Sequence, residues 1–374
     1  MNRAPTFGIE EEYFITDLQS REMLAQPSAQ VLQACRQAIG KGFSFEMFQG
    51  QIEVASPVFN VRSEARAYLG AVRTNLGKSL AELGLGVVCS GSHPLARWHD
   101  QRAASQAHFQ QFFQEFQRVA QRSVLCGLHV HVEVPATVDR IAVMNEVSPW
   151  LPLLLLLSCS SPFWEGEASG FMSYRQAACD EWPRMGVPEY FANWNAYHRY
   201  LNLLRRVGAL DTDGNGWWGI RPAVRYPTLE LRMTDACPRL ADVLTLATLF
   251  RVMVAHASNL PQPGVNFTME DRWLLKENRW RAKRYGVYGT FAIGPEGLLV
   301  SALQWLEYAS QVFGTTCDAM GESGVFEQAR AIVQSGNSAD RQLRCHEAAH
   351  ASGADDQSCL QRVVDQLLVE THNP

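Results

Sequence analysis

The sequence of 374 residues has little that would point to a membrane, to nucleic acid or to an oxidising compartment. Its most apolar run, residues 150–163, is shorter than the roughly 20 residues of a membrane-spanning helix and contains Pro152, which predicts a buried helix. No block of lysine and arginine occurs and the net charge is −5, so nucleic acid is not an expected partner. The nine cysteines form no CxxC pair and the N-terminal residues show no apolar signal segment, which predicts a cytoplasmic protein with reduced thiols.

The common nucleotide-binding and zinc-binding signatures are also missing or incomplete. LGKS at residues 76–79 lacks the first glycine of a P-loop, and GNGWWG at 214–219 leads into a strand rather than from a strand to a helix. HEAAH at 346–350 matches the zinc-hydrolase pattern, but only aspartates or a cysteine follow as a third ligand. A nucleotide therefore needs another kind of site, and zinc hydrolysis is disfavoured.

What the sequence does contain is a series of strands among helices, followed by a helical C-terminal third. Single strands are expected at residues 6–17, 86–94 and 123–135, a strand pair or one bent strand at 43–57, and a strand pair at 216–235. Helices are expected at 61–83, 100–122, 139–158, 193–207, 239–259, 270–285, 295–314, 322–335, 338–351 and 357–371. No linker divides the chain, so we predict a single domain over 1–374, strand-rich over 1–235 and helical over 239–374. This order of elements predicts an α+β fold with a mainly antiparallel sheet.

Three adjacent carboxylates stand in the first expected strand, FGIEEEYFI at residues 7–15. Because successive side chains of a strand point to opposite faces, Glu10 and Glu12 share one face and Glu11 points away. A charged edge strand would explain such a triplet on its own. A pair of carboxylates on one face is also half of a site for a hard cation.

Three further strands offer the other half of such a site, because each is polar on one face and apolar on the other. Their polar residues are Glu53 in QIEVAS, His129, His131 and Glu133 in LHVHVEV, and Glu230 and Arg232 in TLELRM. Each strand alone could simply face solvent. If the strands are neighbours, their faces converge on a carboxylate-rich surface whose like charges require cations. Carboxylates with few nitrogens suit Mg²⁺ or Mn²⁺, which often serves nucleotide phosphates.

Basic residues that could contact phosphate occur in KENRWRAKRYG at 276–286. Arg279 and Lys283 are four residues apart and share one helical face, although a solvated basic helix would show the same pattern. Arg221 in WWGIRP and Arg175 in SYRQ stand beside aromatic residues, and arginine is suited to bidentate recognition of carboxylate or phosphate.

The sequence resembles the carboxylate–amine ligases, also called type 2 glutamate–cysteine ligases. The blocks GIEEEYFITD, CGLHVHVEV, WWGIRP, LELRMTD, ENRWRAKRYG and GNSADRQ occur in the order of that family and span about residues 6 to 371. The resemblance implies a glutamine-synthetase-like catalytic fold, with a curved, mainly antiparallel sheet lined by metal-binding carboxylates and flanked by helices. It also implies ATP-dependent formation of an amide bond through an acyl phosphate, with glutamate, cysteine and ATP giving γ-glutamylcysteine, ADP and phosphate.

The resemblance assigns roles to the residues that the strand faces had already grouped. The implied metal ligands are Glu10, Glu12, Glu53, His129 and Glu230. Arg232 would face the phosphoryl group, His131, Arg279 and Arg284 would contact ATP or phosphate, and Arg221 would contact the substrate. Arg175 is added as a second substrate-binding candidate because arginine suits carboxylate recognition, without support from the resemblance. Glu133 and HEAAH receive no role. Glu11 faces away from the metals, where we expect it to pair with a cation behind the sheet.

We therefore predict a cytoplasmic carboxylate–amine ligase that uses ATP and Mg²⁺ or Mn²⁺, and that forms a homodimer, as the resemblance suggests. One alternative is the same chemistry on another acid and amine. Others are a Mg²⁺-dependent phosphotransferase and a non-catalytic nucleotide or amino-acid binding protein. Loops such as 165–195 and 208–216 are expected to determine specificity.

Overall fold

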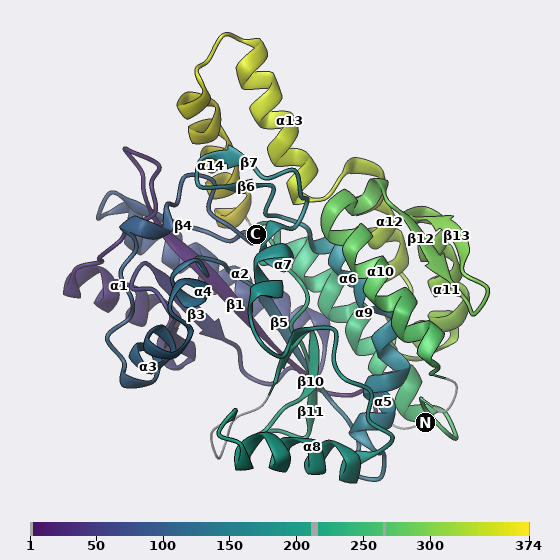
Figure 1. The fold of residues 1–374 in the computed structure, drawn as a ribbon. Helices are drawn as coiled ribbons and strands as arrows, with labels where there is room; N and C mark the ends of the chain where they lie inside the picture. The colour runs from purple at the N-terminus through teal and green to yellow at the C-terminus, as the bar shows by residue number, and fades with distance from the viewer. Residues whose placement is uncertain (1–2, 211–215, 265–266, 374) are drawn as a thin grey trace.

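The computed structural model describes residues 3–210, 216–264 and 267–373, which combine one large antiparallel sheet with a layer of helices (Figure 1). Six of the seven strands are neighbours in the order β10-β11-β5-β1-β3-β2, and β4 also pairs with β1. The bounds are β1 Phe7–Asp17, β2 Phe43–Phe45, β3 Gln51–Ala55, β4 Leu85–Val88, β5 Leu128–Glu133, β10 Ile220–Pro222 and β11 Thr228–Leu231. Every pairing in this sheet is antiparallel, which confirms the predicted α+β class.

Most of the later helices, α9 to α12 with α5 and α6, lie together on the right of Figure 1, whereas α1, α3 and α4 lie on the left and α8 lies at the bottom. Helices α13 and α14 project as a hairpin at the top. The bounds of the helices are α1 Ala29–Ile39, α2 Arg62–Ala81, α3 Ala107–Phe116, α4 Arg118–Gln121, α5 Arg140–Val147, α6 Leu151–Ser158, α7 Tyr174–Ala178, α8 Trp194–Arg206, α9 Leu240–Asn259, α10 Met269–Tyr285, α11 Ala302–Ala319, α12 Val325–Ser335, α13 Ser338–Ala351 and α14 Asp356–His372. Three small strand pairs complete the fold: β6 Phe163–Trp164 with β7 Glu167–Ala168, β8 Met185–Gly186 with β9 Trp217–Trp218, and β12 Thr290–Ile293 with β13 Leu298–Ser301.

The central strand β1 separates an apolar layer from a polar surface. Ile9, Tyr13 and Ile15 alternate along one face of β1 and are fully or almost fully buried, because α2 and α9 pack on that side of the sheet. Each fully buried apolar side chain of this size stabilises the fold by roughly 1.5–3 kcal/mol. The opposite face of β1 presents Glu10 and Glu12, so the packing of the helices decides which carboxylates are free to form a site.

Two of the expected helices differ from the structure. The first part of residues 295–314 is strand β13, which forms a hairpin with β12, and α11 begins only at Ala302. Residues 100–122 contain two helices, α3 and α4, because Gln117 adopts φ 47° between them. The helix expected at 295–314 was wrong over Leu298–Ser301, because a short apolar run fits both a strand and a buried helix.

The apolar segments of the chain are core helices. Residues 140–158 and α9 are long and apolar enough to cross a membrane, but 78% and 83% of their respective apolar windows are buried inside the fold. All residues of α6 are buried, as expected for the run that starts at residue 150. The nine cysteines are free thiols, and eight of them are buried.

Candidate active site

Four neighbouring strands bring the predicted polar side chains together on the face of the sheet that α2 and α9 leave open. Strand register places Glu12 directly across from Glu53, and Glu10 directly across from His129. The ligand atoms of Glu10, His129 and Glu230 lie within 4.8 Å of one another, and those of Glu12, Glu53 and His129 do the same. The two groups share His129, so the five residues form one cluster, the carboxylate cluster.

His129 is the residue that best tests whether this cluster fits a metal. Its Nδ1 lies 3.2 Å from Glu10 Oε2, whereas its buried Nε2 has no hydrogen-bond partner among the described residues. Burial, followed by the nearby charge of Arg232, lowers the pKa of His129 to about 4, so the imidazole is neutral at pH 7. A neutral imidazole whose second nitrogen faces Glu12 Oε1 at 3.6 Å is suited to a metal ion. The chemistry of the donor set therefore fits a divalent cation.

The carboxylates at one end of the cluster favour their protonated forms. Burial, and then the charge of Glu46, raises the pKa of Glu12 to about 8. Burial and the charges of Glu46, Glu10 and Glu12 raise the pKa of Glu53 well above its usual value. Such crowding of acids is unfavourable unless a cation offsets the charge.

The carboxylates at the other end remain ionised. Burial alone would raise the pKa of Glu10, but hydrogen bonds from His129 and His131 outweigh it and lower that pKa. Burial would likewise raise the pKa of Glu230, but the charges of Arg232 and Arg221 lower it. Glu12 and Glu53 therefore favour the protonated form at one end of the cluster. At the other end, histidines and arginines stabilise Glu10 and Glu230 as carboxylates.

Glu46 is a member of the site that the sequence analysis missed. It follows β2 and shares a hydrogen bond with Glu53, and burial raises its pKa. Ser44, two residues earlier, lies directly across from Glu53. The alternation of FSFEMF, in the segment where a strand pair or one bent strand was expected, could have placed Glu46 on the same face as Ser44.

Two guanidinium groups close the cluster around Glu230. Arg221 donates from Nε to Glu230 Oε2 at 2.7 Å and from Nη2 to Oε1 at 3.2 Å, and Arg232 Nη1 also donates to Oε1. The Nε and Nη2 groups of Arg232 hydrogen-bond to none of the described residues, and its side chain is 20% exposed. These N–H groups are available to an anion beside the carboxylate cluster.

Arg175 and His131 lie next to this arrangement in different ways. Arg175 donates to the carbonyl oxygens of Thr234 and Arg232 at 3.1 and 3.3 Å. A Cβ at position 127 would come within 2.3 Å of Arg175 Nη2, so Gly127 is required for this close approach. His131 Nε2 lies 3.3 Å from Glu10 Oε1. Arg175 therefore supports the backbone of Arg232, and its predicted contact with substrate stays a prediction.

The structure does not bring Arg279 and Arg284 to the carboxylate cluster. Arg279 donates to Asp180 Oδ1 at 2.7 Å and to the Gln176 carbonyl at 2.9 Å. The guanidinium of Arg284 lies against the rings of Phe171 and Tyr285. Their predicted contacts with phosphate stay predictions.

The remaining acids of the sequence analysis have structural partners. Glu11 lies behind the sheet and forms an ion pair with Arg73 at 2.5 Å, which confirms the expected cation. Glu133 accepts hydrogen bonds from Arg3 and Thr6.

His346 of HEAAH lies 5.2 Å from the ring of Phe163, measured between centroids. Part of the expected specificity loop 208–216 lies outside the described residues.

Comparison with protein families shows the family to which the chain belongs. The model of glutamate–cysteine ligase family 2 matches residues 6–365. The chain belongs to this family. A family member of Pseudomonas fluorescens, provisionally named glutamate–cysteine ligase 2, is 60% identical over 366 residues, which cover 98% of this chain and 94% of the relative. One of Pseudomonas entomophila with the same provisional name is 46% identical over 370 residues, which cover 99% and 97%.

Solved structures share the fold of this glutamate–cysteine ligase family member. A bifunctional glutathione synthetase from Pasteurella multocida superimposes with a TM-score of 0.72 at 14% identity, over 98% of this chain and 52% of that chain. A glutamate–cysteine ligase from Francisella tularensis in complex with AMP gives 0.69 at 11% identity, over 100% and 90%. At these identities the likeness shows the fold alone. The family assignment identifies an ATP-dependent carbon–nitrogen ligase, as the sequence resemblance implied.

Proposed function

We propose that the protein joins the γ-carboxylate of glutamate to the amino group of cysteine, with ATP as co-substrate and Mg²⁺ as the bound cation. The observation that carries this proposal is the carboxylate cluster, in which Glu10, Glu12, Glu53, His129 and Glu230 meet beside Arg232. Mg²⁺ held by these side chains would offset the negative charge of the ATP phosphates. Mn²⁺ has a similar preference for carboxylate and imidazole ligands.

The side chains can be matched to the two steps of the reaction. In the first step an oxygen of the glutamate carboxylate attacks the γ-phosphorus, and ADP leaves. The free N–H groups of Arg232 would donate to the transferring phosphoryl oxygens, where negative charge accumulates. In the second step the amine nitrogen attacks the acyl carbon, loses a proton, and phosphate leaves. Arg221 would bind a carboxylate of the substrate, and His131 would contact ATP.

A cavity of about 490 Å³ supports a role for Arg279 in binding an anion. Its charged lining residues are Arg184, Lys276, Arg279 and Lys283, together with Asp180 and Glu189. Trp218 of β9 also lines it, and β9 leads into β10, which carries Arg221. Because cations outnumber acids there, we propose that it receives a phosphate or carboxylate group. Arg284 is not among the lining residues, and its contact with phosphate is a separate proposal.

The test is ADP release by the purified protein with Mg²⁺ and ATP, with glutamate and cysteine added singly and together. We expect turnover only with both amino acids, and a product with the mass of γ-glutamylcysteine. Turnover only with another acid and amine would keep the chemistry and change the substrates. ADP release that needs no amine would contradict a ligase and indicate a phosphotransferase.

The raised pKa values of the acids predict a pH dependence of metal binding. At pH 7 the folded, metal-free protein holds a proton on Glu12, whose pKa is about 8, and Mg²⁺ must displace it. Because the folded state raises the pKa of Glu12, protonation of this residue stabilises the metal-free fold. The stabilisation is complete below the pKa of Glu12 in the unfolded chain and is lost as the pH rises through about 8. We expect Mg²⁺ to release protons at pH 7 and fewer at pH 9, measured by calorimetry in buffers of different ionisation enthalpy. Equal release at both pH values would contradict this assignment.

We also propose that the protein is a cytoplasmic homodimer with one catalytic domain. The free, buried thiols support a reducing compartment. Light scattering coupled to size-exclusion chromatography measures the oligomeric state directly.

A further inference from the structure

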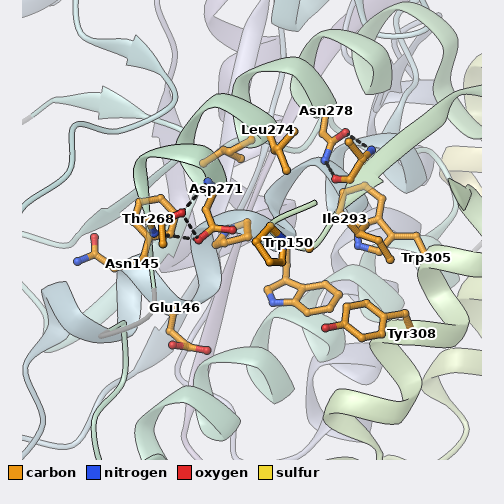
Figure 2. Close-up of a pocket in the computed structure, with 16 residues that line it drawn as sticks. Asn145, Glu146, Trp150, Thr268, Asp271, Leu274, Asn278, Ile293, Trp305 and Tyr308 are labelled. Carbon is orange, nitrogen blue, oxygen red and sulfur yellow. Dashed lines mark hydrogen bonds between the residues drawn. The ribbon is translucent and has the colours of Figure 1, made fainter. Parts of the chain in front are cut away.

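A second cavity, of about 420 Å³, lies in the helical layer away from the carboxylate cluster (Figure 2). It is bordered by α5, α10, α11 and the β12–β13 hairpin, together with the short helical turn Ser148–Trp150. None of its 16 lining residues belongs to the carboxylate cluster or its arginines. The cavity is therefore separate from the residues that we propose for the ligase reaction.

We call this cavity the aromatic pocket, because the rings of Trp150, Trp305 and Tyr308 form one side of it. Trp150 lies with its ring centroid 5.5 Å from that of Tyr308, at an interplanar angle of 27°, and 6.5 Å from that of Trp305, at 29°. Figure 2 shows Trp150 in the centre, with Trp305 and Tyr308 to its right. Tyr308 is 42% exposed, so the pocket is open to solvent at this ring. Aromatic faces of this kind attract a cation through the negative charge density of the ring.

The charge of the lining has one sign. Glu146 and Asp271 line the pocket opposite Trp305, and the described lining includes no lysine, arginine or histidine. One oxygen of Glu146 accepts the Gly264 N–H at 2.8 Å, and one oxygen of Asp271 accepts the Thr268 N–H at 2.9 Å. The other oxygen of each carboxylate accepts no hydrogen bond from the described residues. Both acids therefore keep an acceptor for a ligand.

A third observation comes from the indole nitrogens. Trp305 lines the pocket and is only 2% exposed, yet its N–H donates to no residue in the described part of the chain. The N–H of Trp150 likewise has no protein acceptor within the described ranges. Trp305 is buried and Trp150 is half-buried, and neither indole nitrogen is completely enclosed, so both N–H groups can reach an oxygen atom of a ligand in the pocket.

We propose that the aromatic pocket binds a small organic ammonium compound that also carries a hydroxyl or ether oxygen. The rings and the two carboxylates match the cationic group, and the indole N–H groups match the oxygen. An anion such as ATP has no positive partner among the described lining residues, and a purely apolar ligand would leave the carboxylates and the indole donors unused.

The test uses choline and its uncharged carbon analogue, 3,3-dimethylbutan-1-ol, with titration calorimetry of the full chain. No Mg²⁺, ATP or amino acid is added, so the result does not depend on the proposed ligase reaction. We expect choline to bind with a dissociation constant of about 1 mM, typical of a ligand with so few atoms. The analogue should bind about tenfold more weakly, because only the charge differs.

Two variants locate the binding. Glu146→Gln and Trp150→Leu should each weaken choline about fivefold or more, by loss of the charge or of the ring. Glu277→Gln, on the exposed side of α10, is the matched control and should bind like wild type. Thermal unfolding checks that each variant is folded. Equal binding of choline and its analogue, no binding of choline, or unchanged binding by both pocket variants would each overturn the proposal.

Discussion

Glu53→Gln should abolish ADP formation while leaving the melting temperature of the metal-free protein nearly unchanged. Glutamine has the same shape as a protonated glutamate, and the raised pKa of Glu53 shows that the metal-free site already favours the protonated form. What the variant loses is the ability to ionise when a cation binds. Loss of a charged ligand at a phosphoryl-transfer site is expected to lower kcat by about a thousandfold or more.

Arg232→Ala should have a comparable effect through a different cause. The substitution removes the N–H groups that face the transferring phosphoryl group, for which a loss of about 10²–10³ in kcat is typical of a single donor. Glu230 keeps Arg221 as its partner, so the fold should tolerate the change. Coupled-enzyme measurement of ADP gives kcat, and calorimetry gives the affinity for Mg²⁺, which should change more in Glu53→Gln than in Arg232→Ala.

Glu133→Gln provides the matched control, because Glu133 shares a strand and a face with His129 and His131. Its carboxylate bonds instead to Arg3 and Thr6, and it is not one of the clustered metal-ligand candidates. Turnover of Glu133→Gln should stay close to wild type. Near-normal turnover of Glu53→Gln or Arg232→Ala would remove the proposed site from consideration.

The part of the site that could be predicted from the sequence is the part fixed by the period of a strand. Glu10, Glu12 and Glu53 were grouped because side chains two residues apart share a face, and the strands that carry them are indeed neighbours. The buried partner of Glu11 was expected for the same reason. Alternation is a local property of the backbone, so it needs no knowledge of the fold.

The part that could not be predicted depends on contacts between distant segments. Asp180 pairs with Arg279 across 99 residues, and no periodicity relates the two positions. The burial of Arg175 beneath Arg232 likewise depends on how the loop after α6 folds back. Glu46 was missed for a smaller reason, because β2 has only three residues and a strand that short carries a weak pattern. The hairpin at 290–301 was missed because its apolar residues also fit a helix.

Arg73→Met should lower the free energy of unfolding by about 3–5 kcal/mol, the largest stability effect that we expect from a single substitution here. Arg73 and Glu11 are both fully buried, with side-chain exposures of 0% and 1%. Arg73 also donates to the carbonyl oxygens of Cys237 and Pro238, and Tyr13 donates to Glu11. Methionine has a similar length but leaves the carboxylate of Glu11 without its cation, and a buried unpaired charge is costly.

A double-mutant cycle separates this cost from the loss of packing. Glu11→Gln in the Arg73→Met background removes the unpaired charge, so the double variant should be more stable than Arg73→Met alone. Urea unfolding gives the four free energies, with an expected coupling of about 2–3 kcal/mol. A coupling near zero would mean that the pair acts through shape alone.

The result bears on catalysis because Glu11 lies between Glu10 and Glu12 in β1. Arg73 connects this strand to the segment that follows Arg232. If the pair orders β1, Arg73→Met should also weaken Mg²⁺ binding without removing any side chain that faces the metal.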